Sequence, residues 1–409
     1  MSILSTYSLH CIFQKPFVNC KQAIDSLKLN QLDSVTIEER IKSMKAQAIQ
    51  SIADRKFDQI KNWLQTMPFE GFTGEDLFIK QFIKKGWGQD IAALSNMAEA
   101  LTNIAANTPE RAEEIRPLLD EVIRRARHPS VSPYRKDPAA VSNLNHYGYY
   151  LEHLNIVLGC YHRLFDDKYL QLNERVSEYL RSETLAQKNT HARLIPHVRM
   201  RWSADQAAIL HSLWLFDQNT GAKLADEPVE RWKEFMEAQM RHAGTGLYAT
   251  EVMNVKSYSK EPRGCACAYL THYTAKFAPE IAQEQWQLMK KHLFVRKVGI
   301  TGFREYRDGY QGRWTPDSGP IVAGVGVAAT GLALKAAGTL GDAETFDALF
   351  GSISRSISVL ETLSHLPGVK KIASIGTDLL SSSIYLTALT SRPVGLAASN
   401  SKQTALLAA

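Results

Sequence analysis

The chain has 409 residues, a hydrophobic fraction of 44% and a formal net charge of +6, values that exclude general disorder. Lysines and arginines are spread along the chain rather than clustered, so the sequence does not indicate nucleic-acid binding. Five cysteines, an odd number, do not suggest a disulfide framework and favour a reducing compartment. No uninterrupted apolar run reaches the ~18 residues of a membrane-spanning helix.

The first twenty residues lack a basic start followed by an apolar run of signal-peptide length. We therefore expect a cytoplasmic protein, although an export segment removed ahead of this sequence would leave the same pattern.

Helical periodicity dominates from about residue 37 to residue 390. Thr36 and Glu39 have the spacing of a capping box, which predicts a helix that ends before Pro68. The next two predicted helices are GWGQDIAALSNMAEALTNIAA and TPERAEEIRPLLDEVIRRARH. Pro109 near the first turn marks the start of the second, and Pro117 predicts a kink inside it.

From there an apolar helix rich in small residues alternates with an amphipathic helix. The apolar members are predicted at 146–165, 205–216, 265–277, 318–340 and 372–389. Comparable starts, counted from Gly86, follow at steps of 59, 60, 60, 53 and 60 residues, near Asn145, Asp205, Cys265, Ser318 and Asp378. Two-helix solenoids have shorter periods of ~33–47 residues.

Together with the GWGQDIAALSNMAEALTNIAA helix, these make six apolar helices. Five of the six are followed by an amphipathic helix, which predicts an all-α fold, an (α/α)6 toroid of six helical hairpins. The helix at 37–67 pairs with the last apolar helix and closes the ring. The predicted organisation is an N-terminal extension at 1–36, a single toroid domain at 37–392 and a C-terminal tail at 393–409.

Long loops precede the inner helices, so all of them are expected to open on one face and to surround a central cavity. Asp205 and Asp378 are predicted to begin inner helices, and Asp317 with Ser318 to begin the fifth. Such residues are favoured as N-caps. Carboxyls that converge on one cavity would instead suit general acid–base catalysis.

His146 is predicted on one helix face with Tyr149 and Tyr150, at positions i, i+3 and i+4. Two interpretations are open for His146: a proton shuttle beside an aromatic wall, or a hydrogen-bonded core histidine.

The segment PRGCACAYL places Arg263, Cys265 and Cys267 at the predicted cavity mouth. An arginine and a helix start both lower a cysteine pKa, which favours a thiolate. Ordinary buried thiols are the alternative. No metal is predicted, because a second pair of ligands at zinc-finger spacing is missing.

The loop GFREYRDGYQGRWTPDSGP is rich in charged and aromatic residues. A solvated loop would expose Tyr306 and Trp314, so we interpret it as a lid or wall of the cavity, with Glu305 as its acid/base candidate.

Three segments, WSADQAAILHSLWLFDQNTG, PRGCACAYLTHYTAKFAPEIAQEQW and DSGPIVAGVGVAATG, resemble the linalool dehydratase/isomerase-like proteins of the six-hairpin α/α toroid group. The resemblance implies a site without cofactor or metal at the inner-helix ends. It also implies addition and removal of water at a small terpene alcohol by Asp, His, Tyr and Cys side chains. The family's cysteine-bearing inner helix corresponds to the helix that opens at Asp205, which has no cysteine here.

Three functions are therefore weighed. The first is a cofactor-independent lyase or isomerase acting on a small, largely apolar alcohol. The second is a carbohydrate-active hydrolase, lyase or epimerase with paired carboxylates, and the third is a non-catalytic helical scaffold. The expected partners are a small-molecule substrate and further copies of the chain, with no nucleic acid and no membrane span.

The predicted site residues fall into two groups. The catalytic candidates are Asp205, His146, Glu305, Asp378 and Cys265. The substrate-binding candidates are Tyr149, Tyr150, Trp202, Arg263, Cys267, Tyr306, Trp314 and Asp317.

Overall fold

The computed structural model describes residues 34–67, 89–199, 201–254, 257–258, 261–297, 299–312, 315, 317–322, 324–363 and 378–391. By its internal packing the chain divides into two units, Met1–Asp54 and Arg55–Ala409. The described residues of the first unit belong to helix α2 (Ser34–Thr66), which continues into the second unit. The predicted limits of the N-terminal extension and of the C-terminal tail stay predictions.

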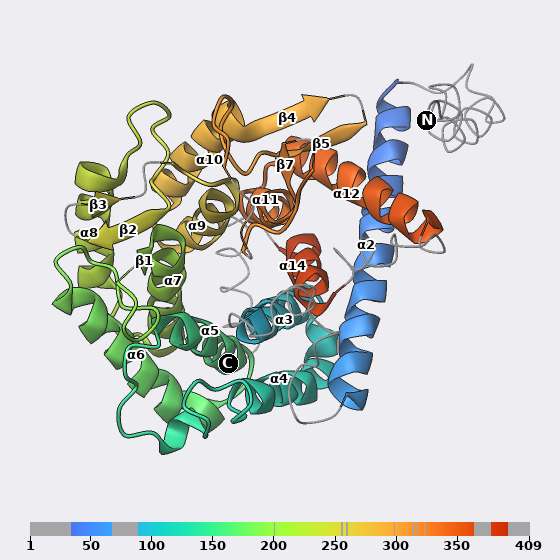
Figure 1. The fold of residues 1–409 in the computed structure, drawn as a ribbon. Coiled ribbons are helices and arrows are strands. Elements are labelled where there is room, and N and C mark those ends of the chain that lie inside the picture. Colours follow the sequence, from blue (N-terminus) through green and yellow to red (C-terminus); the bar gives the residue numbers. More distant parts are fainter. Residues whose placement is uncertain are drawn as a thin grey trace, which may run out of the picture. The chain divides into compact units, whose positions relative to one another are not determined.

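Six inner helices form a closed ring in the second unit (Figure 1). Each of them contacts the next along the chain, and the last contacts the first, so that the ring has no open edge. They are α3 (Gln89–Asn107), α5 (Gly148–Leu164), α7 (Ser203–Thr220), α9 (Gly264–Phe277), α11 (Val327–Leu340) and α14 (Leu379–Thr390). The prediction of an all-α toroid is confirmed.

The inner helices are apolar on nearly every side because other helices surround them. In α5 every residue from Tyr150 to Tyr161 is buried. Small residues let neighbouring helices approach closely. A Cβ atom at Gly159 of α5, for example, would lie 2.8 Å from the Leu215 side chain of α7. No helix in the described part of the chain is both long and apolar enough to cross a bilayer.

Amphipathic helices lie outside this ring (Figure 1). They are α4 (Ala112–Ala126), α6 (Leu170–Ala186), α8 (Asp226–Phe235), α10 (Pro279–Leu293) and α12 (Ala343–Leu363). Short helices join them to their neighbours: η3 (Pro109–Arg111), η4 (Pro138–Ala140), η5 (Asp167–Tyr169) and the π-helical η6 (Met236–Met240). In α4 the buried stripe has the predicted spacing, with Ile115, Leu118, Leu119, Val122 and Ile123 buried.

The part of α2 that belongs to the second unit packs against the first and last hairpins. Its Lys56 ammonium donates a hydrogen bond to the Ser382 hydroxyl of α14 at 3.2 Å. Lys61 forms an ion pair with Glu114 in the first turn of α4 at 2.6 Å. The ring itself closes through α14 and α3, and the predicted pairing of this helix with the last inner helix stays a prediction.

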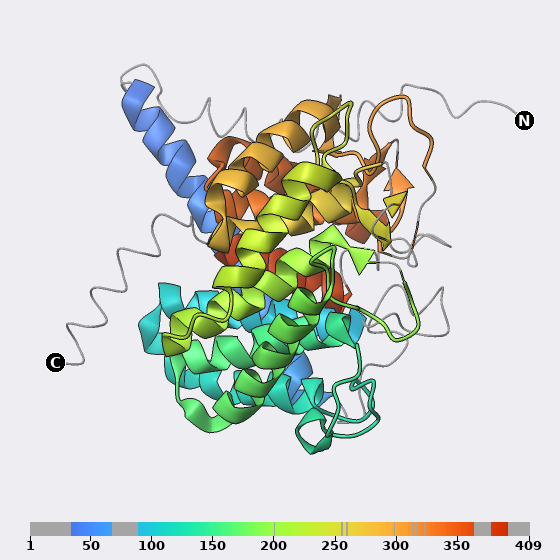
Figure 2. The same cartoon turned by 90° about the vertical axis from the view of Figure 1, so that its left-hand side faces the viewer.

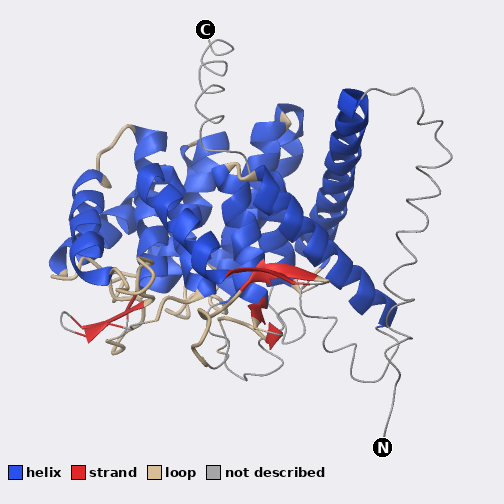
Figure 3. Ribbon diagram, turned by 90° about the horizontal axis from the view of Figure 1, so that it is seen from above, coloured by secondary structure: helices blue, strands red, loops and turns tan. Residues whose placement is uncertain are grey.

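Three small antiparallel sheets lie together at one end of the helices, together with the loops that precede the inner helices (Figures 2 and 3). We call this the loop end. The first sheet holds β1 (Arg201–Trp202), β2 (Glu251–Asn254) and β3 (Ser257–Tyr258). The others are the hairpins β4 (Phe294–Lys297) with β5 (Ile300–Phe303), and β6 (Ile321–Val322) with β7 (Val325–Gly326).

The fifth inner helix differs from the prediction, because it begins at Val327 and not at Ser318. The β6–β7 hairpin takes up the intervening residues. Gly319 and Gly324 have φ values of 59° and 83°, in the left-handed region that breaks a helix and suits a tight turn. These two glycines therefore shape a turn ahead of the helix.

Candidate functional site

Asp205 lies in the first turn of α7, at the loop end, and is partly exposed. The N-cap of α7 is Trp202, so Asp205 does not cap its own helix. No other side chain in the described part of the chain forms an ion pair or hydrogen bond with the Asp205 carboxyl. Burial raises its pKa to about 7, the negative charge of Asp317 adds to the rise, and a hydrogen bond from the Asp205 backbone amide opposes it.

Arg263, the N-cap of α9, connects two carboxylates at the loop end. Its Nη1 lies 2.9 Å from Oδ2 of Asp317, and its Nε donates to Oε1 of Glu305 at 2.8 Å. Its Nη2 also donates to the hydroxyl of Thr315. The Arg263 side chain is 9% exposed, whereas that of Asp317 is 63% exposed, so the arginine holds an anionic carboxylate at the surface of the site.

Glu305 is fully buried behind Arg263. Besides Nε of Arg263, it accepts hydrogen bonds from the backbone N–H of Cys265 at 3.1 Å and from the Cys265 thiol at 3.0 Å. Burial raises the Glu305 pKa, and the Arg263 charge opposes that rise. Both carboxylate oxygens are thus occupied within the protein, and this acid/base candidate faces Arg263 and Cys265 rather than an open cavity.

For both cysteines of α9 the structure favours the buried-thiol alternative over the thiolate. Burial, followed by the negative charge of Glu305, raises the pKa of Cys265 well above its ordinary value and outweighs Arg263. Burial likewise raises the pKa of Cys267 to about 12. The Cys265 thiol donates a hydrogen bond to Glu305, so its role here is to orient that carboxylate.

Asp378 is the N-cap of α14. Its Oδ1 accepts the backbone N–H of Ser381 at 2.8 Å, and its Oδ2 accepts the Ser381 hydroxyl at 3.1 Å. For this residue the structure shows the capping contacts that the sequence offered as the alternative to acid–base chemistry.

His146 lies outside helix α5, which begins only at Gly148. Its φ of 59° is left-handed, so the predicted common helix face with Tyr149 and Tyr150 does not form. The Tyr150 hydroxyl instead donates to the carbonyl of Ala126 in α4 at 2.8 Å. Tyr149 is partly exposed, and the negative charge of Asp205 adds to the effect of burial in raising its pKa.

Glu152 and Tyr269 are neighbours of Asp205 that the sequence analysis did not select. Glu152, in α5, is fully buried, and burial followed by the charge of Asp205 raises its pKa well above the ordinary value. The Tyr269 hydroxyl of α9 lies 3.5 Å from Glu152. The only sequence signal was the position of Glu152 three residues after Tyr149, on the same face of α5.

The other predicted binding residues lie at the same end. Trp202 is partly exposed and pairs with Glu251 between β1 and β2. Tyr306 is partly exposed, with its ring 5.3 Å from that of Tyr310. Trp314 lies outside the described residues.

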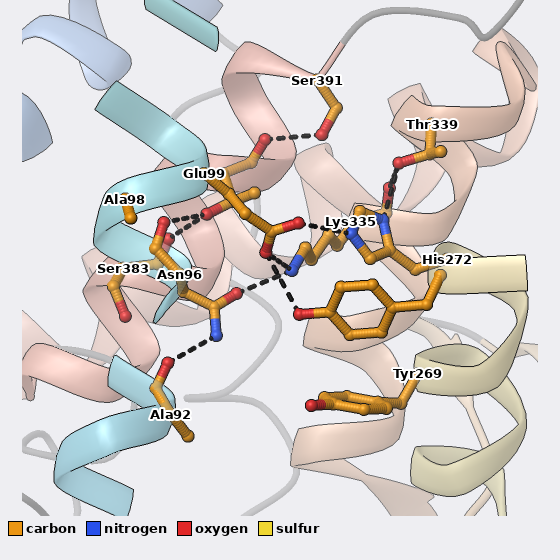
Figure 4. A network of polar contacts seen from close by, with 12 residues as sticks. Ala92, Asn96, Ala98, Glu99, Tyr269, His272, Lys335, Thr339, Ser383 and Ser391 are labelled. Atoms are coloured by element: carbon orange, nitrogen blue, oxygen red, sulfur yellow. Dashed lines mark hydrogen bonds and ion pairs between the residues drawn. The ribbon is translucent and has the colours of Figure 1, made fainter. Parts of the chain in front are cut away.

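A second polar cluster lies deeper in the ring, between α3, α9 and α11 (Figure 4). The Lys335 ammonium is 2.6 Å from Glu99 and donates to the side-chain carbonyl of Asn96 at 2.8 Å. His272 contacts Glu99 at 3.2 Å through Nε2 and the Thr339 hydroxyl at 2.7 Å through Nδ1.

This cluster is closed to solvent, since the Lys335 and Glu99 side chains are 1% and 10% exposed. Burial would raise the pKa of Glu99, but Lys335 and His272 hold it well below its ordinary value. The cluster therefore holds a charged pair that joins inner helices, and we assign it to the core. Among the described residues, no group of three His, Cys, Asp or Glu side chains is placed to hold a metal ion.

No protein-family model and no curated protein matches the chain. Solved structures match its fold. A family 76 glycoside hydrolase from a bovine Bacteroides thetaiotaomicron strain has a TM-score of 0.51 and 12% identity, over 75% of this chain and 70% of that one. A family 76 mannosidase from Bacteroides thetaiotaomicron has the same TM-score of 0.51 and 12% identity, over 83% and 97% of the two chains.

Dfg5 from Chaetomium thermophilum, solved in complex with glucosamine, has a TM-score of 0.50 and 11% identity, over 85% of this chain and 91% of that one. At such low identities the likeness shows a shared α/α toroid fold. It does not show membership of the linalool dehydratase/isomerase-like family.

Proposed function

We propose that the chain is a carbohydrate-active enzyme that breaks a glycosidic bond by acid–base catalysis at the loop end. Asp205 is the proton donor and Asp317 is the second carboxylate. The observation that carries the proposal is the contrast between the two environments. Burial raises the pKa of the partly exposed Asp205 to about 7, whereas Asp317 is more exposed and ion-paired with Arg263. Carboxyls in such unlike surroundings can take the acid and base roles of one reaction.

In this mechanism the Asp205 proton moves to the bridging oxygen as the bond between that oxygen and the anomeric carbon breaks. Asp317 accepts a proton from the water that adds to the anomeric carbon. Arg263 positions Asp317, and Glu305 with Cys265 positions Arg263. Tyr149 and Trp202, both partly exposed at this end, supply aromatic faces on which a sugar ring can stack.

The structural neighbours support a carbohydrate substrate. Two of them are named as family 76 glycoside hydrolases, and the third was solved with glucosamine bound. Fold alone does not determine activity, so the argument depends on Asp205 and Asp317.

A lyase or isomerase acting on a small alcohol is the second candidate. The observation that favours it is the desolvated group beside Asp205, where Glu152 is fully buried and next to the Tyr269 hydroxyl. In that reaction Asp205 protonates a leaving hydroxyl. Asp317 then removes a proton from the neighbouring carbon, which leaves an alkene and water.

The test is a turnover assay with two sets of substrates, mannose- and glucosamine-containing oligosaccharides in one and terpene alcohols in the other. We expect sugar release by the wild type and a loss of at least ~100-fold in Asp205→Asn and Asp317→Asn, the usual scale of acid–base catalysis. Asp378→Asn is the matched control, because Asn caps a helix as well as Asp does.

Turnover of terpene alcohols alone, lost in the same two variants, would replace the glycosidase with the lyase or isomerase. A folded Asp205→Asn protein with wild-type turnover would refute the role of Asp205 in either reaction.

A further inference from the structure

A pocket of about 550 Å³ opens at the loop end beside the start of α7. Two loops form it, the one before α5 and the one before β1 and α7. Five of its eight lining residues are arginine or histidine, and none is acidic: Asn145, His146, Arg193, Pro196, His197, Val198, Arg199 and Arg201.

One carboxylate near the pocket is already used by the protein. Glu183, in α6, contacts Nδ1 of His146 at 3.2 Å and Nε of Arg193 at 3.5 Å, and its side chain is 9% exposed. It also accepts a hydrogen bond from Gln187 at 3.1 Å. Glu183 therefore offsets one of the three arginine charges at the pocket.

Neither of the other two arginines forms an ion pair with an acidic side chain among the described residues. The Nη2 of Arg201 donates to the side-chain carbonyl of Gln187 at 3.2 Å, and its Nη1 donates to the backbone carbonyl of Arg199 at 2.8 Å. Both acceptors are neutral, and Nε of Arg201 is buried without a partner in the described part of the chain. The exposed Arg199 guanidinium makes no hydrogen bond or ion pair with the described residues.

The electrostatics of Arg201 agree with an excess of positive charge. Burial lowers the pKa of Arg201, the positive charge of Arg193 lowers it further, and the negative charge of Glu183 opposes both effects. A bound anion would relieve this repulsion and accept hydrogen bonds from the exposed Arg199 guanidinium.

Backbone contacts hold the pocket in shape. The amides of Gly148 and Tyr149 donate to the carbonyls of Arg193 and Leu194 at 3.0 Å and 3.2 Å, which joins the two loops. His146 and His197, which both line the pocket, have left-handed φ values of 59° and 65°. Non-glycine residues keep such conformations only where the surrounding structure enforces them, and they are common at binding sites.

We propose that this pocket binds an oxyanion, the phosphate, sulfate or carboxylate group of a ligand, through the guanidinium groups of Arg199, Arg201 and Arg193. Planar guanidinium groups match the geometry of these anions and bind them by charge-assisted hydrogen bonds. The proposal does not depend on the catalytic assignment of Asp205.

The test measures binding of inorganic phosphate and of sulfate by calorimetry and thermal shift at constant ionic strength. We expect millimolar or tighter binding to the wild type and a loss of about tenfold or more in Arg199→Gln, the effect of removing a hydrogen bond to a charged group. Arg199 is exposed, so its replacement should not affect folding, whereas the half-buried Arg201 is tested second, as Arg201→Gln. Glucuronate and a sugar phosphate distinguish a carboxylate from a phosphate source.

Arg181→Gln is the matched control, because Arg181 lies on α6, outside the pocket lining, and pairs with Glu227. It removes the same charge and should bind phosphate as the wild type does. If Arg199→Gln and Arg181→Gln weakened phosphate binding equally, the effect would come from the net charge alone, and the proposal would be overturned. Failure of the folded wild type to bind any of the four anions would overturn it as well.

Discussion

At the scale of single residues, the buried pair of Lys335 and Glu99 makes a sharp prediction. Lys335→Met leaves Glu99 without its cation, and an uncompensated buried charge costs about 3–5 kcal/mol. We expect the free energy of unfolding in urea to fall by that amount. The double variant Glu99→Gln/Lys335→Met should recover part of the loss, because no net charge then stays buried.

The control for this pair is Lys290→Met. Lys290 forms an ion pair with Asp342 at 2.7 Å, but its side chain is 28% exposed. Pairs in contact with solvent contribute about 0–1 kcal/mol. If Lys335→Met were no more destabilising than Lys290→Met, the assignment of the deep cluster to core stability would be wrong.

Residue types predicted the location of the site better than the role of each side chain. Asp205, Arg263, Asp317 and Glu305 do lie at the starts of inner helices or in the loops before them. Whether a carboxyl caps a helix, anchors another side chain or contacts no other side chain depends on its neighbours in space, which separates Asp378 and Glu305 from Asp205. Glu152 was missed because its neighbour Asp205 is about fifty residues away along the chain.

At the scale of elements, the junction between β5 and α9 depends on Gly264. A Cβ atom there would lie 2.1 Å from the Arg304 carbonyl oxygen and 2.9 Å from the Ala329 side chain. Since backbone cannot yield as a flexible side chain does, Gly264→Ala should destabilise the fold by about 1–3 kcal/mol and displace Arg263 and Cys265. Urea unfolding measures the first effect, and the accessibility of the Cys265 thiol to a labelling reagent measures the second.

Gly331→Ala provides the comparison, because Gly331 lies inside helix α11 with no atom within 4 Å of an added Cβ. Replacing such a glycine by alanine in a helix should stabilise the protein by about 0.5–1 kcal/mol. The same chemical change is thus expected to have opposite signs at two glycines. A stabilised Gly264→Ala protein would show that the close approach is not a constraint.

Periodicity predicted the helices of this chain more reliably than their starts. The inner helices at Gly148, Ser203, Gly264 and Leu379 begin within three residues of the positions expected from the repeat. Val327 begins nine residues late, because the turn glycines that precede it resemble the small residues of an inner helix. The strands have only two to four residues and form because loops pair with one another. Such short strands contain too few residues to show the alternation of apolar and polar side chains by which a strand is predicted.

At the scale of the whole molecule, the closed ring buries titratable groups at its centre. Contact between α14 and α3 completes the circle, as the count of six apolar helices predicts. Burial lowers the pKa values of His153, His211 and His272 to about 3. The unfolded chain binds a proton at each of them below about pH 6.5, which the folded ring does not. Their contribution therefore destabilises the fold as the pH decreases.

The raised pKa values of Asp205 and Glu152 act in the opposite direction, because the folded state then binds more protons than the unfolded chain as the pH falls below 7. The net slope of stability against pH is a difference between these contributions. A single substitution isolates one of them. The ring of His211 lies 5.7 Å from that of Trp214 and 5.1 Å from that of Tyr273, so His211→Phe keeps an aromatic ring there and removes the titration.

In the wild type, His211 stays neutral in the folded state and therefore contributes a loss of stability as the pH falls from 7 to about 4.5. His211→Phe lacks this loss, so its change in unfolding free energy over the same pH range should be more favourable than that of the wild type by roughly 2–3 kcal/mol. The measurement is urea unfolding at both pH values. His128→Gln, which removes a partly exposed histidine outside the ring, is the control for the loss of a histidine as such. Equal pH differences in all three proteins would mean that His211 is protonated in the folded state, and that water or an anion reaches the centre of the ring.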